Sequence, residues 1–151
     1  MKKASIFFTI AIVAMVAGCS GCGKKVAPLS EVIGRVWSAQ TVKEGSTIVY
    51  TKGATTNVRA GYSNFKLDLS SPSKVTYTEF DGNTFTGTWA VSESATGNKL
   101  TLTGLTPQPT GTTGTIEFTI NSYSETEFSL TRTTSSPKTG GTINSYNLVS
   151  P

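Results

Sequence analysis

Carboxylates are the side chains with which this sequence could do acid–base chemistry, because it contains no histidine and only two cysteines. Histidine is the commonest general base and the commonest metal ligand in proteins. Hydrolysis of a sugar would instead need two facing carboxyl groups about 5–10 Å apart. Most acidic residues fall in turns or on the outward faces of predicted strands, among them Asp68, Asp81, Glu117 and Glu127. We therefore predict that the protein is not an enzyme, with a hydrolase as the weaker alternative.

Glu79 is the exception among the acidic residues. Alternation through Tyr77 points its side chain inward with the apolar residues. A charge on an inner face is costly unless it is paired or reaches water at the end of the domain. Glu79 is therefore a candidate to bind the polar head of a ligand, or to pair with Arg132 on the inward face of a later strand. The alternative is a strand end or bulge before Asp81-Gly82 that leaves Glu79 in water.

Aromatic residues recur through the same region and are candidates to line a pocket. Trp37, Tyr77 and Trp89 would give such a pocket apolar walls. Glu79 and Arg132 would hold a polar group of the ligand, and together these five residues form the predicted site for a small hydrophobic molecule. The alternative is that the aromatic residues fill the core, in which case little room remains for a ligand.

Apolar and polar residues alternate with a period of two from residue 31 onward. Residues 84–91 show the pattern best, because Phe85, Trp89 and Val91 fall on one face and threonines on the other. The other runs with this period are residues 65–69, 75–77, 100–102, 116–120, 128–130 and 146–148. Turn-forming residues separate the runs, and no window keeps a helical period of 3.6 residues. The sequence therefore predicts an all-β fold of eight or nine antiparallel strands.

Two connections between the predicted strands are longer than the others. They run from Thr51 to Ala60 and from Thr106 to Gly114. Binding residues often lie in such loops at one end of a barrel, and the alternative is that both are simply solvated.

Charge and composition argue against several classes of ligand. The formal net charge is +4, and the basic residues are scattered rather than clustered, so no nucleic acid is expected as a partner. Calcium needs clustered oxygen ligands, and the segment Asp81-Gly82-Asn83 is too short to supply them. We expect no metal and no cofactor.

The N-terminal residues have the parts of a secretory leader. Lys2 and Lys3 precede an apolar run of residues 4–17, which is too short to span a membrane. The tetrad Val16-Ala17-Gly18-Cys19 resembles the lipobox of bacterial lipoproteins. This resemblance implies that leader 1–18 is removed, that Cys19 is acylated with chains such as palmitate, and that residues 19–30 form a lipidated, flexible tether. An ordinary secretory leader is the alternative, and the role of Cys22 stays open.

Five short segments carry a second resemblance, which covers most of the domain at residues 31–151. They are Gly34-Arg35-Val36-Trp37, Phe65-Lys66-Leu67, Gly87-Thr88-Trp89, Lys99-Leu100-Thr101-Leu102 and Phe128-Ser129-Leu130-Thr131-Arg132. Together they resemble the lipocalin-like lipoproteins of Bacteroidetes-type bacteria. The resemblance implies an antiparallel meander closed into a barrel of about eight strands, with Arg132 packed over the ring of Trp37.

These features predict a lipid-anchored lipoprotein of the cell envelope whose barrel is a non-catalytic binding module. The membrane is a partner through the lipid on Cys19, and a small hydrophobic ligand or an envelope protein is the other. In the bacterial group that these segments resemble, export to the cell surface goes with acidic residues soon after the lipidated cysteine. None follows Cys19 closely, so the resemblance implies the outer membrane with the domain facing the periplasm. A filled barrel that binds proteins, for example as an enzyme inhibitor, is the alternative.

Overall fold

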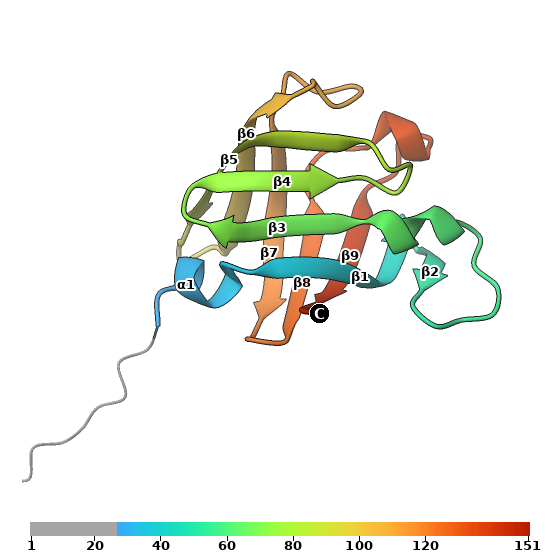
Figure 1. Cartoon of the computed structure of the whole chain (residues 1–151), viewed down its shortest axis with the longest axis horizontal. Coiled ribbons are helices and arrows are strands. Elements are labelled where there is room, and N and C mark those ends of the chain that lie inside the picture. Colours follow the sequence, from blue (N-terminus) through green and yellow to red (C-terminus); the bar gives the residue numbers. More distant parts are fainter. Residues whose placement is uncertain (1–26) are drawn as a thin grey trace, which may run out of the picture.

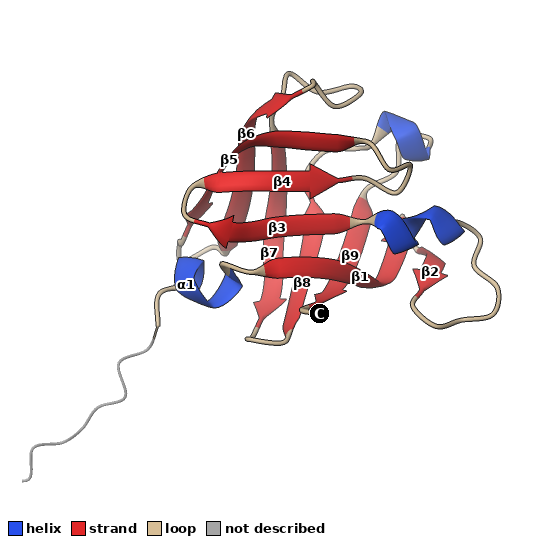
Figure 2. Cartoon of the chain, viewed as in Figure 1, coloured by secondary structure: helices blue, strands red, loops and turns tan. Residues whose placement is uncertain are grey.

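The structure, a computed structural model, describes residues 27–151 as nine antiparallel strands and three short helices (Figure 1, Figure 2). In chain order the elements are α1 (Leu29–Ile33), β1 (Val36–Glu44), β2 (Thr47–Thr51), η1 (Ala60–Asn64), β3 (Lys66–Ser71), β4 (Lys74–Thr78), β5 (Thr84–Ser92), β6 (Asn98–Thr106), β7 (Ile116–Tyr123), β8 (Glu127–Arg132), η2 (Pro137–Thr139) and β9 (Asn144–Val149). The predicted leader, Cys19 and Cys22 lie outside the described residues. No helix within residues 27–151 is long and apolar enough to cross a membrane.

Eight of the strands close into a barrel. β1 and β3 to β9 follow one another as antiparallel neighbours, and β9 returns to pair with residues 38–44 of β1. β3 pairs with residues 36–38 of β1, whereas the additional strand β2 pairs with residues 41–44 on the same side. Closure leaves no long open edge on the barrel. The predicted all-β fold, an antiparallel barrel of about eight strands, is confirmed.

The barrel interior is filled by the inward faces of its strands. In β5, Phe85 and Trp89 are buried while the threonines between them are exposed, as the alternation predicts. The buried apolar residues of the strands and of α1 form one continuous cluster. The rings of Phe65 and Tyr146 stack with their centroids 4.9 Å apart, and Tyr77 meets Phe65 edge-on at 5.7 Å. An eight-stranded barrel is narrow enough for side chains to fill it in this way.

Helix α1 packs against one end of the barrel, which we call the α1 end. Leu29 and Ile33 are buried, and the indole Nε1 of Trp37 donates a hydrogen bond of 2.9 Å to the carbonyl oxygen of Ile33. The sequence did not predict this helix, because five residues are too few to show a helical period. The buried Leu29 belongs to the segment expected to be tether, so the folded domain begins before residue 31.

Gly87 allows β5 and β6 to approach closely where their register shifts. A Cβ atom at this position would lie 2.5 Å from the carbonyl oxygen of Thr103. A real side chain does not tolerate such a contact with a backbone atom. The glycine is therefore required by packing between two strands.

Candidate functional site

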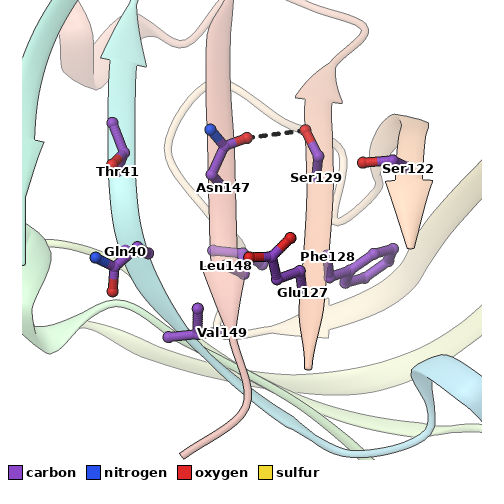
Figure 3. Close-up of a pocket in the computed structure, with 9 residues that line it drawn as sticks. All are labelled: Gln40, Thr41, Ser122, Glu127, Phe128, Ser129, Asn147, Leu148 and Val149. Atoms are coloured by element: carbon purple, nitrogen blue, oxygen red, sulfur yellow. Dashed lines mark hydrogen bonds between the residues drawn. The ribbon is translucent and has the colours of Figure 1, made fainter. Parts of the chain in front are cut away.

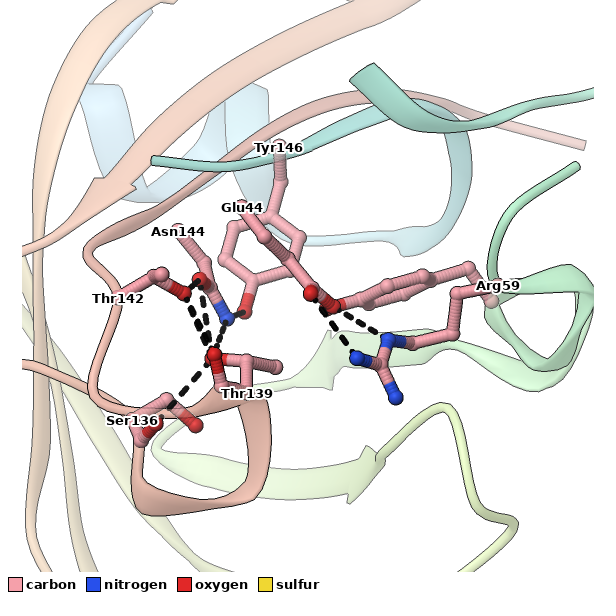
Figure 4. A network of polar contacts seen from close by, with 8 residues as sticks. Glu44, Arg59, Ser136, Thr139, Thr142, Asn144 and Tyr146 are labelled. Atoms are coloured by element: carbon pink, nitrogen blue, oxygen red, sulfur yellow. Dashed lines mark hydrogen bonds and ion pairs between the residues drawn. The ribbon is translucent and has the colours of Figure 1, made fainter. Parts of the chain in front are cut away.

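The barrel end opposite α1, which we call the η2 end, is covered by residues 133–143, the connection from β8 to β9 (Figure 1). Figure 4 shows the buried amide of Asn144 holding this connection in place. Its Oδ1 accepts a hydrogen bond of 2.8 Å from Thr142, and its Nδ2 donates one of 3.1 Å to Thr139. The backbone N–H of Ser136 also bonds to the carbonyl of Thr142 at 2.9 Å. Because a buried amide without partners is costly, these bonds fix the connection over the barrel.

A second polar contact at the η2 end joins β1 to η1. The carboxylate of Glu44 accepts a hydrogen bond of 3.0 Å from a terminal nitrogen of Arg59, and the Nε atom of Arg59 lies 2.6 Å from its other oxygen in an ion pair (Figure 4). The hydroxyl of Tyr62 donates to the same carboxylate at 2.9 Å. Burial, together with the nearby carboxylate, raises the pKa of Tyr62, so its phenol keeps its proton. The planar guanidinium fork suits this two-point contact and anchors the loop that follows β2.

Lys138 of η2 forms ion pairs with two carboxylates. Its Nζ bonds to Glu79 and lies 2.7 Å from Asp81. Burial opposes the charge on the ammonium, but the hydrogen bonds to Asp81 and Glu79 outweigh it and raise the pKa of Lys138. Asp81 shows the converse: slight burial acts to raise its pKa, and the bond from Lys138 lowers it overall. The charged partner of Glu79 is therefore Lys138 and not Arg132, and Glu79, at 6 % exposure, does not lie in water.

Arg132 ends β8 and is only 4 % exposed. Its buried Nε has no hydrogen-bond partner among the described residues, and it takes part in none of their ion pairs. The side chain lines a small cavity of about 10 Å³ together with Tyr77, Glu79 and Tyr146. A cavity of this size holds about one water molecule.

The expected packing of Arg132 over Trp37 is not found. The guanidinium that faces the Trp37 ring is that of Arg35, with its Cζ 6.0 Å from the ring centroid. Arg35 also donates to the carbonyl oxygen of Glu125 and so ties β1 to the turn between β7 and β8. The direction of β8 explains this difference. The ring centroids of Trp37 and Phe128 are 5.1 Å apart, and Arg132 comes four residues after Phe128. Four strand residues span about 13 Å, so Arg132 lies too far along the barrel to reach Trp37.

Trp89 lines a groove at the α1 end of the barrel, between α1 and strands β3 to β5. The groove has a volume of about 520 Å³, and its walls include Pro28, Leu69, Pro72 and Val91. The indole Nε1 of Trp89 donates to the carbonyl oxygen of Ser71 at 3.0 Å, so the polar atom of the ring is already satisfied. The ring therefore offers the groove an apolar surface.

A smaller, polar hollow of about 310 Å³ lies over β1, β8 and β9 (Figure 3). Its polar walls include Gln40, Ser129 and Asn147, and Ser129 donates to the side-chain oxygen of Asn147 at 2.9 Å. Buried Phe128 and Leu148 form its floor. The hollow has no exposed aromatic ring and no paired acids, and it suits a hydrogen-bonding surface better than a catalytic centre.

The structure brings three of the five predicted ligand residues together. Tyr77, Glu79 and Arg132 line the small cavity at the η2 end, whereas Trp37 is enclosed under α1 and Trp89 faces the groove at the α1 end. The sequence reasoning missed Lys138, which carries no periodic signal, although the neighbouring Pro137 and the Gly140-Gly141 pair mark the turn that presents it. Within residues 27–151, no group of three or more acidic, histidine or cysteine side chains could hold a metal ion.

Comparisons with known proteins find similarity in structure alone. No protein family model matches the chain, and no curated protein matches it in sequence. A lipocalin-like protein from Bacteroides uniformis is 13 % identical with a TM-score of 0.46, over 80 % of this chain and 99 % of that one. An uncharacterized protein from Bacteroides eggerthii is 11 % identical with a TM-score of 0.43, over 78 % of this chain and 98 % of that one. Similarity at this level assigns neither a family nor a function to the chain.

Proposed function

We propose that this chain is a lipid-anchored lipoprotein of the cell envelope whose filled, lipocalin-like barrel is a non-catalytic binding module for a protein. The observation that carries the proposal is the filled interior. Sites for small molecules usually have volumes of about 300–1,000 Å³. The cavity at the η2 end has about 10 Å³, and both ends of the barrel are closed by side chains. Of the two kinds of binding module that the sequence predicts, the filled barrel that binds proteins is the better supported.

A non-catalytic role is supported by the state of the inward carboxylate. Glu79 and its neighbour Asp81 are both bound to the ammonium of Lys138. A general acid or base has to exchange a proton with its substrate, and a substrate has to reach it. Glu79 is buried and ion-paired beneath η2, so neither condition is met in this conformation.

The anchor is supported by the lipobox-like tetrad that ends in Cys19. Pro28 lies nine positions after Cys19, and a fully extended segment of that length reaches at most about 32 Å. Acyl chains on Cys19 would therefore hold the α1 end of the domain within that distance of the outer membrane, in the periplasm.

The anchor is tested by metabolic labelling of bacteria that express the full chain, with an alkyne analogue of palmitate. We expect the label on the protein and its loss in Cys19→Ser, while Cys22→Ser is the matched control and keeps it. An unlabelled wild-type protein, or a Cys19→Ser variant that is still labelled, would contradict the anchor.

The protein-binding role is tested by placing a photo-crosslinking residue at exposed positions of the envelope-localised protein. Val58, which is 82 % exposed in the loop after β2, is the test position, and Thr86 on the outer face of β5 is the control. We expect one discrete crosslinked product from position 58 and none from position 86. Absence of a product at 58, or equal products at both, would contradict a specific protein partner there.

The groove beside Trp89 favours a second candidate function, binding of a small hydrophobic molecule at the α1 end of the barrel. Its volume of about 520 Å³ falls in the range of ligand sites. In a Trp37→Phe variant, Trp89 is the only tryptophan, so its fluorescence reports on the groove alone. Titration with a long-chain fatty acid would shift this emission in a saturable way if the groove binds it, and a linear response would reject this candidate.

A further inference from the structure

Large apolar side chains are exposed on and around strand β2. Ile48 of β2 is 54 % exposed, and Val58 lies in the loop that follows this strand. Ile143 is 41 % exposed beside the turn between β1 and β2, where its carbonyl oxygen accepts a hydrogen bond of 2.9 Å from Gly45. Three of the four exposed large apolar side chains among residues 27–151 therefore gather here. Exposed apolar side chains that gather in one patch mark a binding surface.

The loop that carries Val58 projects from the side of the barrel and is tied back to β2 (Figure 1). The side chain of Asn57 accepts a hydrogen bond of 2.7 Å from the backbone N–H of Thr51 and donates one of 3.1 Å to its carbonyl oxygen. The backbone N–H of Arg59 donates to the carbonyl oxygen of Val49 at 2.9 Å. Because these bonds order the loop in the free protein, binding through Val58 costs little conformational entropy.

Lysines accompany these apolar side chains. Lys43 lies opposite Ile48 in the register of β1 and β2, so the two side chains share one outer face. Lys52 begins the loop that carries Val58, and Lys66 begins β3, which follows that loop and η1. None of the three lysines takes part in an ion pair with another described residue. The β2 surface is the name that we give to the six side chains of this region: Ile48, Val58, Ile143, Lys43, Lys52 and Lys66.

The positive charge is local to this surface and is not a property of the whole domain. The chain has 13 basic and 9 acidic side chains, and four of the basic ones are lysines that precede residue 27, so the side chains of residues 27–151 are formally neutral. Residues 40–66 hold four basic side chains and a single acid, Glu44, which is already bound to Arg59. The rest of the domain therefore has an excess of acids. Charge that is separated in this way steers partners of opposite charge to one face.

The arrangement of charge and apolar surface defines what a partner has to offer. Protein interfaces combine an apolar centre with a polar rim. Ile48 and Val58 suit the centre, and Lys43 and Lys52 suit the rim. A basic partner would bring like charges together, whereas carboxylates on the partner would pair with the lysines.

We propose that the β2 surface docks an acidic protein, whose carboxylates surround an apolar pocket that receives Val58. This inference rests on the proposed protein-binding function and adds the chemistry of the partner. The lysines raise the rate of encounter and fix the orientation of the partner, while Ile48 and Val58 lose their contact with water.

The test combines the photo-crosslinking residue at position 58 with reversal of single charges in the full, envelope-localised chain. Lys43→Glu and Lys52→Glu are made separately. We expect each to lower the yield of the crosslinked product at least about threefold, because an attraction at the rim is replaced by a repulsion. Lys74→Glu is the matched control: it changes the net charge equally at the exposed start of β4, and it should keep the wild-type yield.

The crosslinked segment of the partner is then sequenced by mass spectrometry, and we expect aspartate or glutamate beside the crosslinked position. Replacement of these acids by lysine in the partner should restore crosslinking to the Lys52→Glu variant. Such a charge exchange separates a direct contact from a change in the folding of either protein, because a misfolded variant is not rescued by a substitution in its partner.

Three results would overturn the proposal. Equal yields from the wild type, Lys43→Glu and Lys52→Glu would leave the protein-binding function in place but exclude an acidic partner, as would a partner segment without acids. Binding to vesicles that contain phosphatidylglycerol, lost in Lys52→Glu and with no protein crosslinked at position 58, would identify an anionic membrane as the occupant. Absence of any crosslinked product from the wild type would contradict the proposed function itself, and the inference would fall with it.

Discussion

Replacement of Lys138 by methionine would show how strongly the ion pairs at the η2 end stabilise the fold. Methionine keeps most of the apolar part of the side chain but removes the ammonium. Glu79, whose side chain is 7 % exposed, is then left without a cation, whereas Asp81 regains water. Removal of one partner from a buried ion pair costs about 3–5 kcal/mol. Because the pair lies at the end of the barrel, we expect Lys138→Met to lower the free energy of unfolding by about 2–4 kcal/mol.

The assay is equilibrium unfolding in urea at neutral pH, followed by far-ultraviolet circular dichroism and tryptophan fluorescence. Glu79→Gln in the Lys138→Met background removes the unpaired charge, so this double variant should regain more than half of the lost stability. Lys99→Met is the matched control. Its pair with Glu117 lies on the outer face of the barrel, and exposed pairs contribute about 0–1 kcal/mol.

Two results would refute this reasoning. If Lys138→Met costs no more than Lys99→Met, the buried pair does not hold the connection between β8 and β9. If Glu79→Gln makes the Lys138→Met variant still less stable, the cost does not come from an unpaired buried carboxylate. Either result would show that the ion pairs of Lys138 do not hold the connection over the η2 end of the barrel.

Three further predictions concern stability. Trp37→Phe loses the hydrogen bond to the carbonyl of Ile33 and some core volume, and we expect a loss of about 1–3 kcal/mol in the same urea experiment. Gly87→Ala places a Cβ against the backbone of β6, so its melting temperature should fall. The same change at exposed Gly53 meets no neighbouring atom and strains only its own backbone, at a φ of +82°, so its effect should be smaller. Because the pKa of Asp81 is lowered in the folded protein, Asp81 stabilises the fold above pH 3.8, its ordinary pKa, and this stability is lost as the pH falls. Because the pKa of Lys138 is raised, Lys138 stabilises the fold below pH 10.5, its ordinary pKa, and this stability is lost as the pH rises. Melting curves across pH should therefore show both losses in the wild type. In Lys138→Met the loss at high pH should be absent and the loss at low pH smaller, because the backbone N–H of Asn83 still bonds to Asp81.

The strands could be predicted from the sequence because a barrel strand has one face inside and one face in water. The alternation through Phe85 and Trp89 therefore gives the strand and also its buried face. The order of the strands followed from the short turns between them, since such turns join neighbours. Helix α1 could not be predicted, because its five residues are ordered by contact with the barrel and not by a period of their own.

The polar contacts at the ends of the barrel were harder to predict. Glu79 was expected on the inward face, and it is buried there, but its ion-pair partner Lys138 lies 59 residues further along the chain. Alternation says which face a residue occupies and nothing about how far along the barrel axis its neighbours lie. The expected contact between Arg132 and Trp37 failed for this reason: both point inward, but their strands place them near opposite ends. Arg35, two residues from Trp37, takes that position instead.

The two ends of the barrel are closed by different chemistry, and both closures direct binding to the outer surface. At the α1 end, Trp37 is enclosed under a helix, and at the η2 end an ion-paired connection covers the interior. A partner therefore has to bind outside. The described chain exposes Ile48 and Val58 there, on β2 and in the loop that follows it. Closure of the barrel does not require β2, because β9 already pairs with β1. β2 and the loop after it expose apolar side chains without closing the barrel, and they are the segment on which we expect selection for binding to have acted.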